Sequence, residues 1–351
     1  MNKIGFACKW VDLDPKIVEA TSFKRTTVRW CKEHPTVMDA RLELLVEQNC
    51  AALDSLIDQV SRLQPNLRMC RLTSDLLPLF THEVGKRFYE SPETLSYIAA
   101  RFARAGARAR AAGVRLSFHP GQFTVLNTPN EKLLESSIAE VEMHTQQAGW
   151  LGATSWHQDG FCINIHAGGK AGGLDSLAAA IRRLSTEAQN LLTIENDEFS
   201  WSVADLVGAK LPVPIVVDVH HYWIHSGEYL QPESALWAQV MDGWRGVRPK
   251  IHCAMSNIEH LADCSADELP ELAQLLAAGK TKSTLRAHSQ SAHHEPLIDY
   301  FLEFWPSADL MWEGKNKNAD AAAILARYQV NNPHTCYHSS YHETIPPQRA
   351  A

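Results

Sequence analysis

The amino-acid sequence predicts a single-domain (β/α)₈ TIM barrel, and three observations lead to this fold class. Short apolar runs alternate with stretches of helical periodicity along the chain, as they do in α/β proteins. The length of 351 residues is usual for such a barrel with insertions. An open doubly wound sheet is the alternative, but the sequence lacks the Gly-rich turn that usually follows its first strand.

Eight apolar runs are the expected strands of the barrel. Each is four to six residues long and lies between helical or turn-forming sequences, which is typical of buried parallel strands. In chain order they cover residues 3–8, 67–72, 114–119, 161–166, 191–195, 214–218, 249–253 and 310–313.

Helices are expected between these strands and after the last one. Residues 39–64 carry apolar side chains at a helical period. Ser91 followed by Pro92 indicates a capped helix start, and Gly113 indicates where that helix ends. Further helices are predicted at residues 131–151, 174–184, 203–207, 233–243 and 320–328.

The barrel is expected to occupy residues 1–330. Between the seventh and eighth strands, residues 255–297 are predicted to form an insertion over the barrel mouth, with a helix at 267–277. Residues 331–351 are expected to be a weakly ordered tail, because they combine an Asn-Asn-Pro sequence, three histidines and a Pro-Pro pair.

Composition narrows the class of protein. Hydrophobic residues make up 45% of the chain, yet no run reaches the roughly 20 apolar residues of a membrane span. Strand-like sequence begins at residue 3, with no signal-peptide layout before it. We therefore expect a cytoplasmic protein that does not contact a membrane.

Cysteine spacing and net charge argue against two further classes of protein, namely thiolate zinc proteins and generally basic nucleic-acid binders. The eight cysteines show no C-x-x-C spacing and several lie in apolar runs, so we expect buried thiols and no thiolate zinc cluster. The formal net charge of −7, with a pI of about 6.2, argues against a generally basic nucleic-acid binder. Bound dications would reverse that sign locally, so a nucleic-acid substrate stays open.

Six of the apolar runs end on residue types that bind metals. Parallel strands end on one face of a barrel, where barrel active sites lie, so these side chains should surround a single mouth. His221, three residues after Asp218, and His288 extend the set. The candidate ligands are His119, His166, Glu195, Asp218, His221, His252, His288 and Glu313.

A polynuclear metal site is the simplest account of this pattern. A mixture of imidazole and carboxylate ligands suits Zn²⁺ or Mn²⁺, whereas a site of oxygen ligands alone would suit Mg²⁺ or Ca²⁺. The alternative is that these residues are ordinary polar caps of strands, satisfied by loop backbone.

Lys250 lies two residues before His252, so both side chains face the same way on a strand. An ammonium group would be repelled by nearby dications. We expect Lys250 to be neutral, its pKa lowered by desolvation and charge, or to be carboxylated and to act as a ligand. The alternative is an ion pair with a carboxylate such as Glu195. Lys250, Glu195 and His252 are the residues expected to carry the chemistry.

The segments around the mouth also carry candidate contacts to nucleic acid. Gly121 permits a tight turn that would project Gln122 and Phe123 outward, as an amide and an aromatic ring suited to wedging into a base stack. Alternatively, Phe123 packs beneath its own loop. Phe6 is expected on the same rim.

A basic cluster that includes Lys24 and Arg25 suits phosphate oxygens. A solvated surface is an equally good interpretation of this cluster.

Taken together, these residues resemble the UV damage endonuclease family. The resemblance covers most of the chain, and its specificity comes from the order and spacing of the pieces. They are Ile4-Gly-Phe-Ala-Cys8, Arg71-Leu-Thr-Ser-Asp75, His119-Pro-Gly-Gln-Phe123, Asn164-Ile-His-Ala167, Glu195-Asn196, Val217-Asp-Val-His-His221, Lys250-Ile-His252, Arg286-Ala-His288 and Trp312-Glu-Gly-Lys315.

The resemblance implies a barrel that binds bent duplex DNA and up to three metal ions, often Mn²⁺, with Zn²⁺ or Mg²⁺ as alternatives. It implies hydrolysis of the phosphodiester immediately 5′ to cyclobutane dimers and 6-4 photoproducts, leaving a 3′-hydroxyl and a 5′-phosphate. The eight candidate ligands would bind the metals, and Lys250 would be the modified lysine. Gln122 and Phe123 would fill the gap left by flipped nucleotides. We expect a monomer with no nucleotide cofactor.

The sequence departs from the family pattern in two respects. Phe123 and Phe6 stand where the family often carries Tyr, which keeps stacking but removes hydroxyl contacts to the lesion. The stretch between His252 and His288 is unusually long. His293 or His294 is therefore an alternative to His288 as a ligand.

Three rival functions are compatible with the residues. An apurinic endonuclease would differ in the lesion that it recognises. A metal-dependent sugar isomerase or epimerase would use the same barrel and similar ligands, but would have no need of a projecting Gln-Phe tip. A lesion-binding protein without catalysis would bind damaged DNA and leave it intact.

Overall fold

The eight predicted strands are all present. The computed structural model describes residues 1–262 and 264–333, so most of the tail predicted at 331–351 lies outside the described residues. Each strand falls on its predicted apolar run, with ends that differ by at most two residues. The strands are β1 (Ile4–Ala7), β2 (Met69–Leu72), β3 (Arg115–Phe118), β4 (Cys162–His166), β5 (Leu192–Glu195), β6 (Ile215–Val216), β7 (Lys250–Cys253) and β8 (Asp309–Trp312).

All strand pairs are parallel, in the order β6-β5-β4-β3-β2-β1-β8-β7. The two outer strands of this order also meet. A parallel bridge joins Asp218 to His252, and the His252 N–H donates to the Val217 carbonyl at 2.9 Å. The sheet therefore closes on itself as a (β/α)₈ barrel, which confirms the predicted fold class over an open doubly wound sheet.

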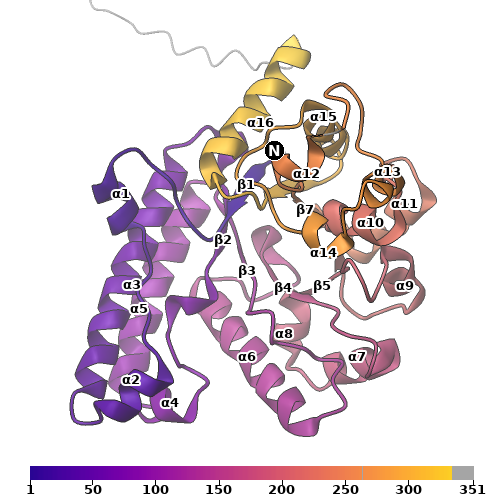
Figure 1. Cartoon of the computed structure of the whole chain (residues 1–351). Coiled ribbons are helices and arrows are strands. Elements are labelled where there is room, and N and C mark those ends of the chain that lie inside the picture. Colours follow the sequence, from indigo (N-terminus) through magenta and orange to yellow (C-terminus); the bar gives the residue numbers. More distant parts are fainter. Residues whose placement is uncertain (263, 334–351) are drawn as a thin grey trace, which may run out of the picture.

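A ring of helices surrounds the barrel (Figure 1). One helix of this outer ring follows each strand, as in other barrels of this class. These helices are α3 (Met38–Ser61), α5 (Pro92–Ala111), α6 (Glu131–Trp150), α7 (Gly173–Arg182), α9 (Val203–Gly208), α11 (Ala235–Gly243), α15 (Glu295–Glu303) and α16 (Lys317–Asn331). All but α15 overlap helices that the sequence predicts.

Helix α5 shows how local sequence sets these boundaries. The Ser91 hydroxyl accepts a hydrogen bond from the Thr94 N–H and Pro92 is the first helical residue, as predicted. After the helix, Gly113 has a φ of 65°, a left-handed conformation that glycine adopts without steric cost.

Further helices lie in the loops between these elements. They are α1 (Pro15–Ala20), α2 (Val28–Glu33), α4 (Glu83–Tyr89), α8 (Thr186–Leu191), α10 (Val219–Ser226), α12 (Ile258–Leu261), α13 (Leu272–Ala277) and α14 (Lys282–Leu285). Within residues 1–262 and 264–333, none of the helices has both the length and the apolar character needed to span a bilayer.

The segment between β7 and α15 contains α12, α13 and α14. Its predicted helix at 267–277 begins later than expected, at Leu272. The reason is Pro270, which disfavours helical backbone at the residue before it. The two ends of the segment meet in an antiparallel bridge between Ser256 and His288. This bridge carries His288 back to the ends of the barrel strands.

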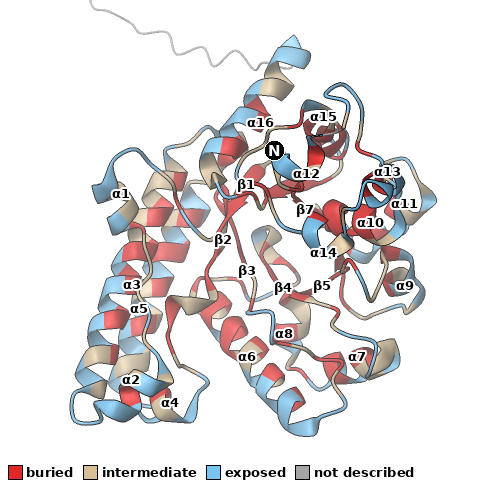
Figure 2. Ribbon diagram, viewed as in Figure 1, coloured by how far each residue is buried: buried red, intermediate tan, exposed pale blue. Residues whose placement is uncertain are grey.

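Burial follows the layers of the barrel. The strands are buried on both faces, whereas the surrounding helices are buried only where they face the barrel (Figure 2). Two successive residues of β1, Phe6 and Ala7, show what lies on the two faces of the strand. Phe6 packs with apolar side chains of α3, whereas Ala7 packs with Met69 and Met311. The packed core therefore holds the strands in place, and the polar residues at their carboxyl ends lie together at one end of the barrel.

Candidate metal centre

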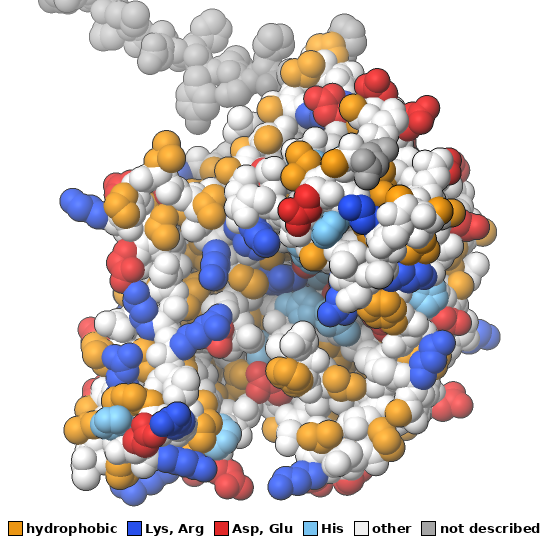
Figure 3. All heavy atoms as spheres, viewed as in Figure 1, with side chains coloured by type: hydrophobic (Ala, Val, Ile, Leu, Met, Phe, Trp, Pro, Cys, Tyr) orange, Lys and Arg blue, Asp and Glu red, His pale blue; other side chains and the backbone are white. Residues whose placement is uncertain are grey.

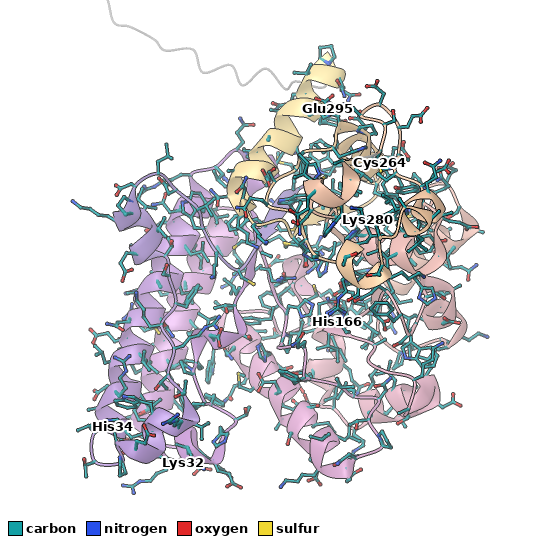
Figure 4. The ribbon with its side chains drawn as sticks, viewed as in Figure 1. Lys32, His34, His166, Cys264, Lys280 and Glu295 are labelled. Atoms are coloured by element: carbon teal, nitrogen blue, oxygen red, sulfur yellow. The ribbon has the colours of Figure 1, made fainter. Side chains whose placement is uncertain are left out.

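The six strand ends predicted to carry ligands meet at one mouth of the barrel. His166 and Glu195 are the last residues of β4 and β5, and His252 lies in β7. His119, Asp218 and Glu313 lie one or two residues beyond β3, β6 and β8. His166 lies near the middle of the view in Figure 4. Figure 3 shows histidine side chains in a hollow there, with lysine and arginine side chains around it.

Potential ligand atoms gather in three groups, here called ligand trios. Within each trio, one ligand atom from each residue lies within 4.8 Å of the others. Glu195 belongs to two trios and so does Asp218, so these two carboxylates link the three trios. The trios are His119, His166 and Glu195; Glu195, Asp218 and His252; and Asp218, His221 and His288.

Glu195 is the centre of this arrangement. Its carboxylate oxygens lie 3.2 Å from His119 Nε2 and 3.1 Å from His252 Nδ1, and the Asn164 side chain donates to the same carboxylate. Burial alone would raise the pKa of Glu195, but His252, His166 and His119 outweigh it and hold that pKa well below its ordinary value. Glu195 is therefore an anion among imidazoles.

Asp218 is positioned by the start of α10. It is the N-cap of this helix, and its Oδ1 accepts hydrogen bonds from the N–H groups of His220 and His221 at 2.8 Å each. The Asn196 side chain holds the Asp218 backbone at both its N–H and its carbonyl. The first helical turn places His221 Nε2 3.8 Å from Asp218 Oδ2. This local geometry brings the two residues together as predicted.

Glu313 and His252 meet on the opposite side of Glu195. His252 Nδ1 lies 3.2 Å from Glu313 Oε1, and the Arg71 guanidinium forms an ion pair with the same carboxylate. Burial would raise the pKa of Glu313, but Arg71, His252 and His288 lower it well below its usual range. Glu313 is therefore ionised, although it stands outside the three ligand trios.

His288 is the histidine of its segment that reaches the other ligands. Its Nδ1 lies 3.8 Å from Glu313 Oε2, and it belongs to the trio with Asp218 and His221. His293 instead lies with its Nδ1 2.9 Å from the Ser291 carbonyl, and His294 is the N-cap of α15. Among the described residues, neither belongs to a trio.

Lys250 lies inside the barrel, buried beneath the ligands. Its Nζ donates to the Ser117 hydroxyl at 3.2 Å, and burial lowers the pKa of its amine. No ion pair between Lys250 and Glu195 is present in the described part of the chain, which weakens the ion-pair alternative. A neutral amine is the form that carboxylation requires.

The donors at the mouth fit divalent cations. Burial lowers the pKa of His119 to about 4, so its imidazole is neutral and carries one lone pair that can bind a metal. His252 Nε2 and Asp218 Oδ2 are buried without a hydrogen-bond partner among the described residues. Burial would lower the pKa of His221, but Asp218, Glu195 and Glu198 raise it to about 9, a sign of excess negative charge. A bound cation would satisfy these atoms and this charge.

The loop after β3 has the predicted exposed tip. Gly121 turns the chain tightly, because its carbonyl accepts from the Thr124 N–H at 2.9 Å. Gln122 is exposed, and Phe123 is 87% exposed. Phe123 therefore does not pack beneath its own loop, and its ring is available to a ligand.

The predicted position of Phe6 on the exposed rim is wrong. Phe6 is only 1% exposed and packs edge-to-face against Trp10, with ring centroids 5.8 Å apart. The strand alternation directs its ring into the layer between the barrel and α3. Phe6 therefore does not offer a surface for DNA in this structure.

The basic cluster is exposed but already has acidic partners. Lys24 forms an ion pair with Glu19, and Arg25 lies 2.6 Å from Asp75. Exposed ion pairs of this kind are weak, so both cations can exchange a carboxylate for a phosphate at little cost.

Sequence reasoning assigned no role to several residues that order the ligands. Asn164 and Asn196 hold Glu195 and Asp218, and Arg71 holds Glu313. Two of these residues could have been found from spacing. Asn164 lies two residues before His166 on β4, on the same face, and Asn196 follows Glu195 directly. The role of Arg71 could not be found from spacing, because Arg71 on β2 and Glu313 after β8 are far apart in the chain.

Comparison with known proteins identifies relatives along most of the chain. The UV-damage endonuclease of Schizosaccharomyces pombe is 28% identical over 278 residues, which cover 76% of this chain and 41% of that protein. The UV-damage endonuclease of Neurospora crassa is 30% identical over 75% of this chain and 38% of its own length. The aligned region thus spans about two fifths of these fungal relatives.

A bacterial relative and a solved structure extend this similarity. The UV DNA damage endonuclease of Clostridium perfringens is 25% identical over 98% of this chain and 74% of its own length. The crystal structure of SacUVDE superimposes with a TM-score of 0.71 and 20% identity, covering 94% of this chain and 99% of that one. The two proteins share a fold. The model of the family "UV-endonuclease UvdE" matches residues 2–332, and the chain belongs to this family.

Proposed function

We propose that this protein is a metal-dependent DNA repair endonuclease that hydrolyses the phosphodiester immediately 5′ to UV photoproducts. The products would be a 3′-hydroxyl and a 5′-phosphate. The observation that carries the proposal is the set of three ligand trios that share Glu195 and Asp218 at the mouth of a UvdE-family barrel. The relatives named as UV-damage endonucleases support the choice of substrate.

The chain's own residues would hold up to three ions, with Mn²⁺ the expected metal and Zn²⁺ or Mg²⁺ as alternatives. The three trios and Glu313 supply the ligands, while Asn164 and Asn196 keep the two shared carboxylates in place. Divalent ions bound here would activate a water and stabilise the charge that develops on the leaving oxygen.

Arg71 and Lys250 would adjust the charge of this centre. Arg71 reaches Glu313 from β2, so its positive charge lies beside the carboxylate at the edge of the ligand set. Lys250, in its neutral form, would add to carbon dioxide and release a proton, and the resulting carbamate would present oxygen atoms in place of an ammonium group.

Gln122 and Phe123 would read the lesion. An exposed aromatic ring and an amide at the tip of a tight turn can enter the space left when damaged nucleotides leave the stack. A distorted or damaged step costs less to open than an intact one, which supplies selectivity. Lys24 and Arg25 would contact the backbone.

One incision assay tests this function. End-labelled duplexes carrying one defined photoproduct, one abasic site or no damage are incubated with Mn²⁺, Zn²⁺ or Mg²⁺, with and without chelator. The proposal expects metal-dependent cutting 5′ to the photoproduct and a 3′ end that a polymerase extends. Preferential cutting at the abasic site would instead establish an apurinic endonuclease. Binding without cutting in any metal would establish a lesion-binding protein.

Membership of the UvdE family disfavours the sugar isomerase. The isomerase alternative is tested by incubating the protein with free sugars and the same metal ions, and by measuring whether the sugars are converted. A sedimentation measurement would test the expected monomer.

A further inference from the structure

The loop after β5 presents a second exposed aromatic ring at the mouth. Phe199 is 49% exposed. The Asp197 carboxylate accepts hydrogen bonds from the N–H groups of Phe199 at 2.8 Å and of Trp201 at 3.3 Å, and the Asp197 N–H donates to the Trp201 carbonyl at 3.2 Å. These bonds hold the loop in one shape, so the ring is presented with little remaining conformational freedom.

Arg286, from the segment between β7 and α15, lies over this ring. Its guanidinium carbon is 5.7 Å from the Phe199 ring centroid, within the range of a cation–π contact. Its Nη1 lies 2.7 Å from Glu198 Oε1, which fixes the side chain in this place. Arg286 and Phe199 thus form one unit built from two separate loops.

This unit is connected to the candidate metal centre. Glu198 Oε2 lies 3.9 Å from Nε2 of His221, a member of a ligand trio. His288 of the same trio follows Arg286 by two residues. Phe199 and Arg286 therefore lie at the edge of the metal centre, and not on a remote surface.

A second cation–aromatic pair lies on the neighbouring loops. Lys170, which follows β4, lies with its Nζ 5.8 Å from the ring of Trp201. The exposed ring of Phe123 rises after β3, and His166 at the end of β4 comes between the two loops in strand order. Exposed aromatic rings thus follow both β3 and β5 at the mouth, and the cations Lys170 and Arg286 lie beside rings of the β5 loop.

We propose that Phe199 and Arg286 form a second nucleic-acid platform, in which the Phe199 ring stacks on an unstacked base and Arg286 binds an adjacent phosphate. This inference rests on the proposed function. Aromatic rings interleaved with cations are the combination that binds single strands and opened duplexes, because every base has a π-face and every nucleotide a charge. Together with the Phe123 tip, the platform would grip an opened duplex on both sides of the metal centre.

The chain offers a closely matched control for this pair. Tyr97 on α5 is 43% exposed, and the Arg101 guanidinium carbon lies 5.7 Å from its ring centroid. This pair is on an outer helix, between the barrel and solvent. A general effect of removing an exposed ring or its arginine would show equally at Tyr97 and Arg101.

The first experiment measures binding of a duplex with one photoproduct by fluorescence anisotropy in Mn²⁺. All variants are made in a His252→Ala background to prevent cutting. Phe199→Ala is expected to raise the Kd by about 5- to 100-fold, the usual value of one base stacked on an aromatic ring. Phe199→Trp should keep the parental Kd, and so should Tyr97→Ala. Metal content, measured by elemental analysis, should be the same in all four proteins.

The second experiment measures the salt dependence of the same binding. Arg286→Gln should reduce the slope of log K against log salt by about 0.7 to 0.9, the value for one lost phosphate contact, whereas Arg101→Gln should leave it unchanged. A Phe199→Ala protein that binds as tightly as the Tyr97→Ala protein would overturn the platform and leave the endonuclease proposal intact. A His252→Ala parent that does not prefer damaged to undamaged duplex, together with a wild-type protein that cuts neither, would overturn the function itself.

Discussion

Asp218 and His252 form the parallel bridge that joins β6 to β7 and closes the barrel, and both also belong to the ligand trio that contains Glu195. The contact that closes the barrel and the assembly of the candidate metal centre thus involve the same two residues. Since the ligand side chains come together only when the barrel is closed, metal binding should favour the folded state.

Removal of metal should therefore lower stability. At free Mn²⁺ about 100-fold above Kd, a single site adds about 2.7 kcal/mol, enough to raise the thermal midpoint by several degrees. Asp218→Asn should lose much of this rise, although Asn can still cap α10. Asp14→Asn, a substitution at the exposed N-cap of α1, should keep it. Scanning calorimetry with and without chelator tests this, and equal midpoints in both conditions would contradict it.

Incision should depend on candidate ligands that sit apart from the exposed tip formed by Gln122 and Phe123. Glu313→Gln and His252→Ala should each abolish cutting while binding of damaged duplex largely persists, because each removes a ligand or a charge beside the centre. His34→Ala and Glu259→Gln, at exposed positions, should cut normally. Cutting and binding are measured on the same duplex. Retained cutting in both ligand variants would reject the metal assignment.

The exposed tip should control discrimination between damaged and intact DNA. The double variant Gln122→Ala, Phe123→Ala should bind the two duplexes with more similar Kd values while retaining its metals, since it removes only the wedge. Leu133→Ala removes another exposed apolar side chain and should leave the ratio of the two Kd values as it is. If the double variant discriminates as well as the parent, the proposal that Gln122 and Phe123 insert into the base stack is wrong.

Lys250 should carry an acid-labile carboxyl group. The intact mass of the native protein should exceed that of the acid-treated protein by one carbon dioxide, and a Lys250→Met variant should show no such difference. Lys250→Met should also lose most of its incision activity, because it cannot supply the carbamate oxygens. A native protein of unmodified mass, with normal cutting by Lys250→Met, would leave Lys250 as a buried structural lysine.

Acid should destabilise the metal-free protein as its buried histidines become protonated. Burial lowers the pKa of His119 and of His157 to about 4, from an ordinary value of 6.5. Because the folded pKa is lowered, each histidine's contribution is complete above pH 6.5 and is lost as pH falls from about 6.5 to 4. Each shift corresponds to roughly 3 kcal/mol.

Urea unfolding of chelated protein at a series of pH values measures this loss. His157 is distant from the ligand trios and has a φ of 38°, a left-handed conformation that Asn tolerates. His157→Asn should therefore fold and show a shallower decline in stability over this range. An unchanged slope would mean that other groups cause the loss.

The ends of the strands could be predicted from the sequence because their causes are local. Short apolar runs bounded by turns indicated all eight strands, and the polarity of parallel strands placed His119, His166, Glu195 and Asp218 at one mouth. The capping of α5 by Ser91 was equally readable, since it depends on neighbouring residues. His221 was found from its spacing alone, and the structure shows that this spacing is the first turn of α10.

Other features depended on contacts between distant segments, and only the tertiary structure decided them. Phe6 was misplaced because strand alternation leaves open which of the two faces lies toward a helix. The choice of His288 over His293 and His294 required the bridge to Ser256, 32 residues earlier.

The sequence by itself thus determined the barrel and most of the ligand types, because periodicity and strand polarity are properties of the chain. The tertiary structure alone decided which candidate ligands come together in each trio, that Arg71 pairs with Glu313, and that Arg286 lies over Phe199. The physical reason is that these contacts join residues far apart in the chain, and their geometry exists only after the barrel has closed.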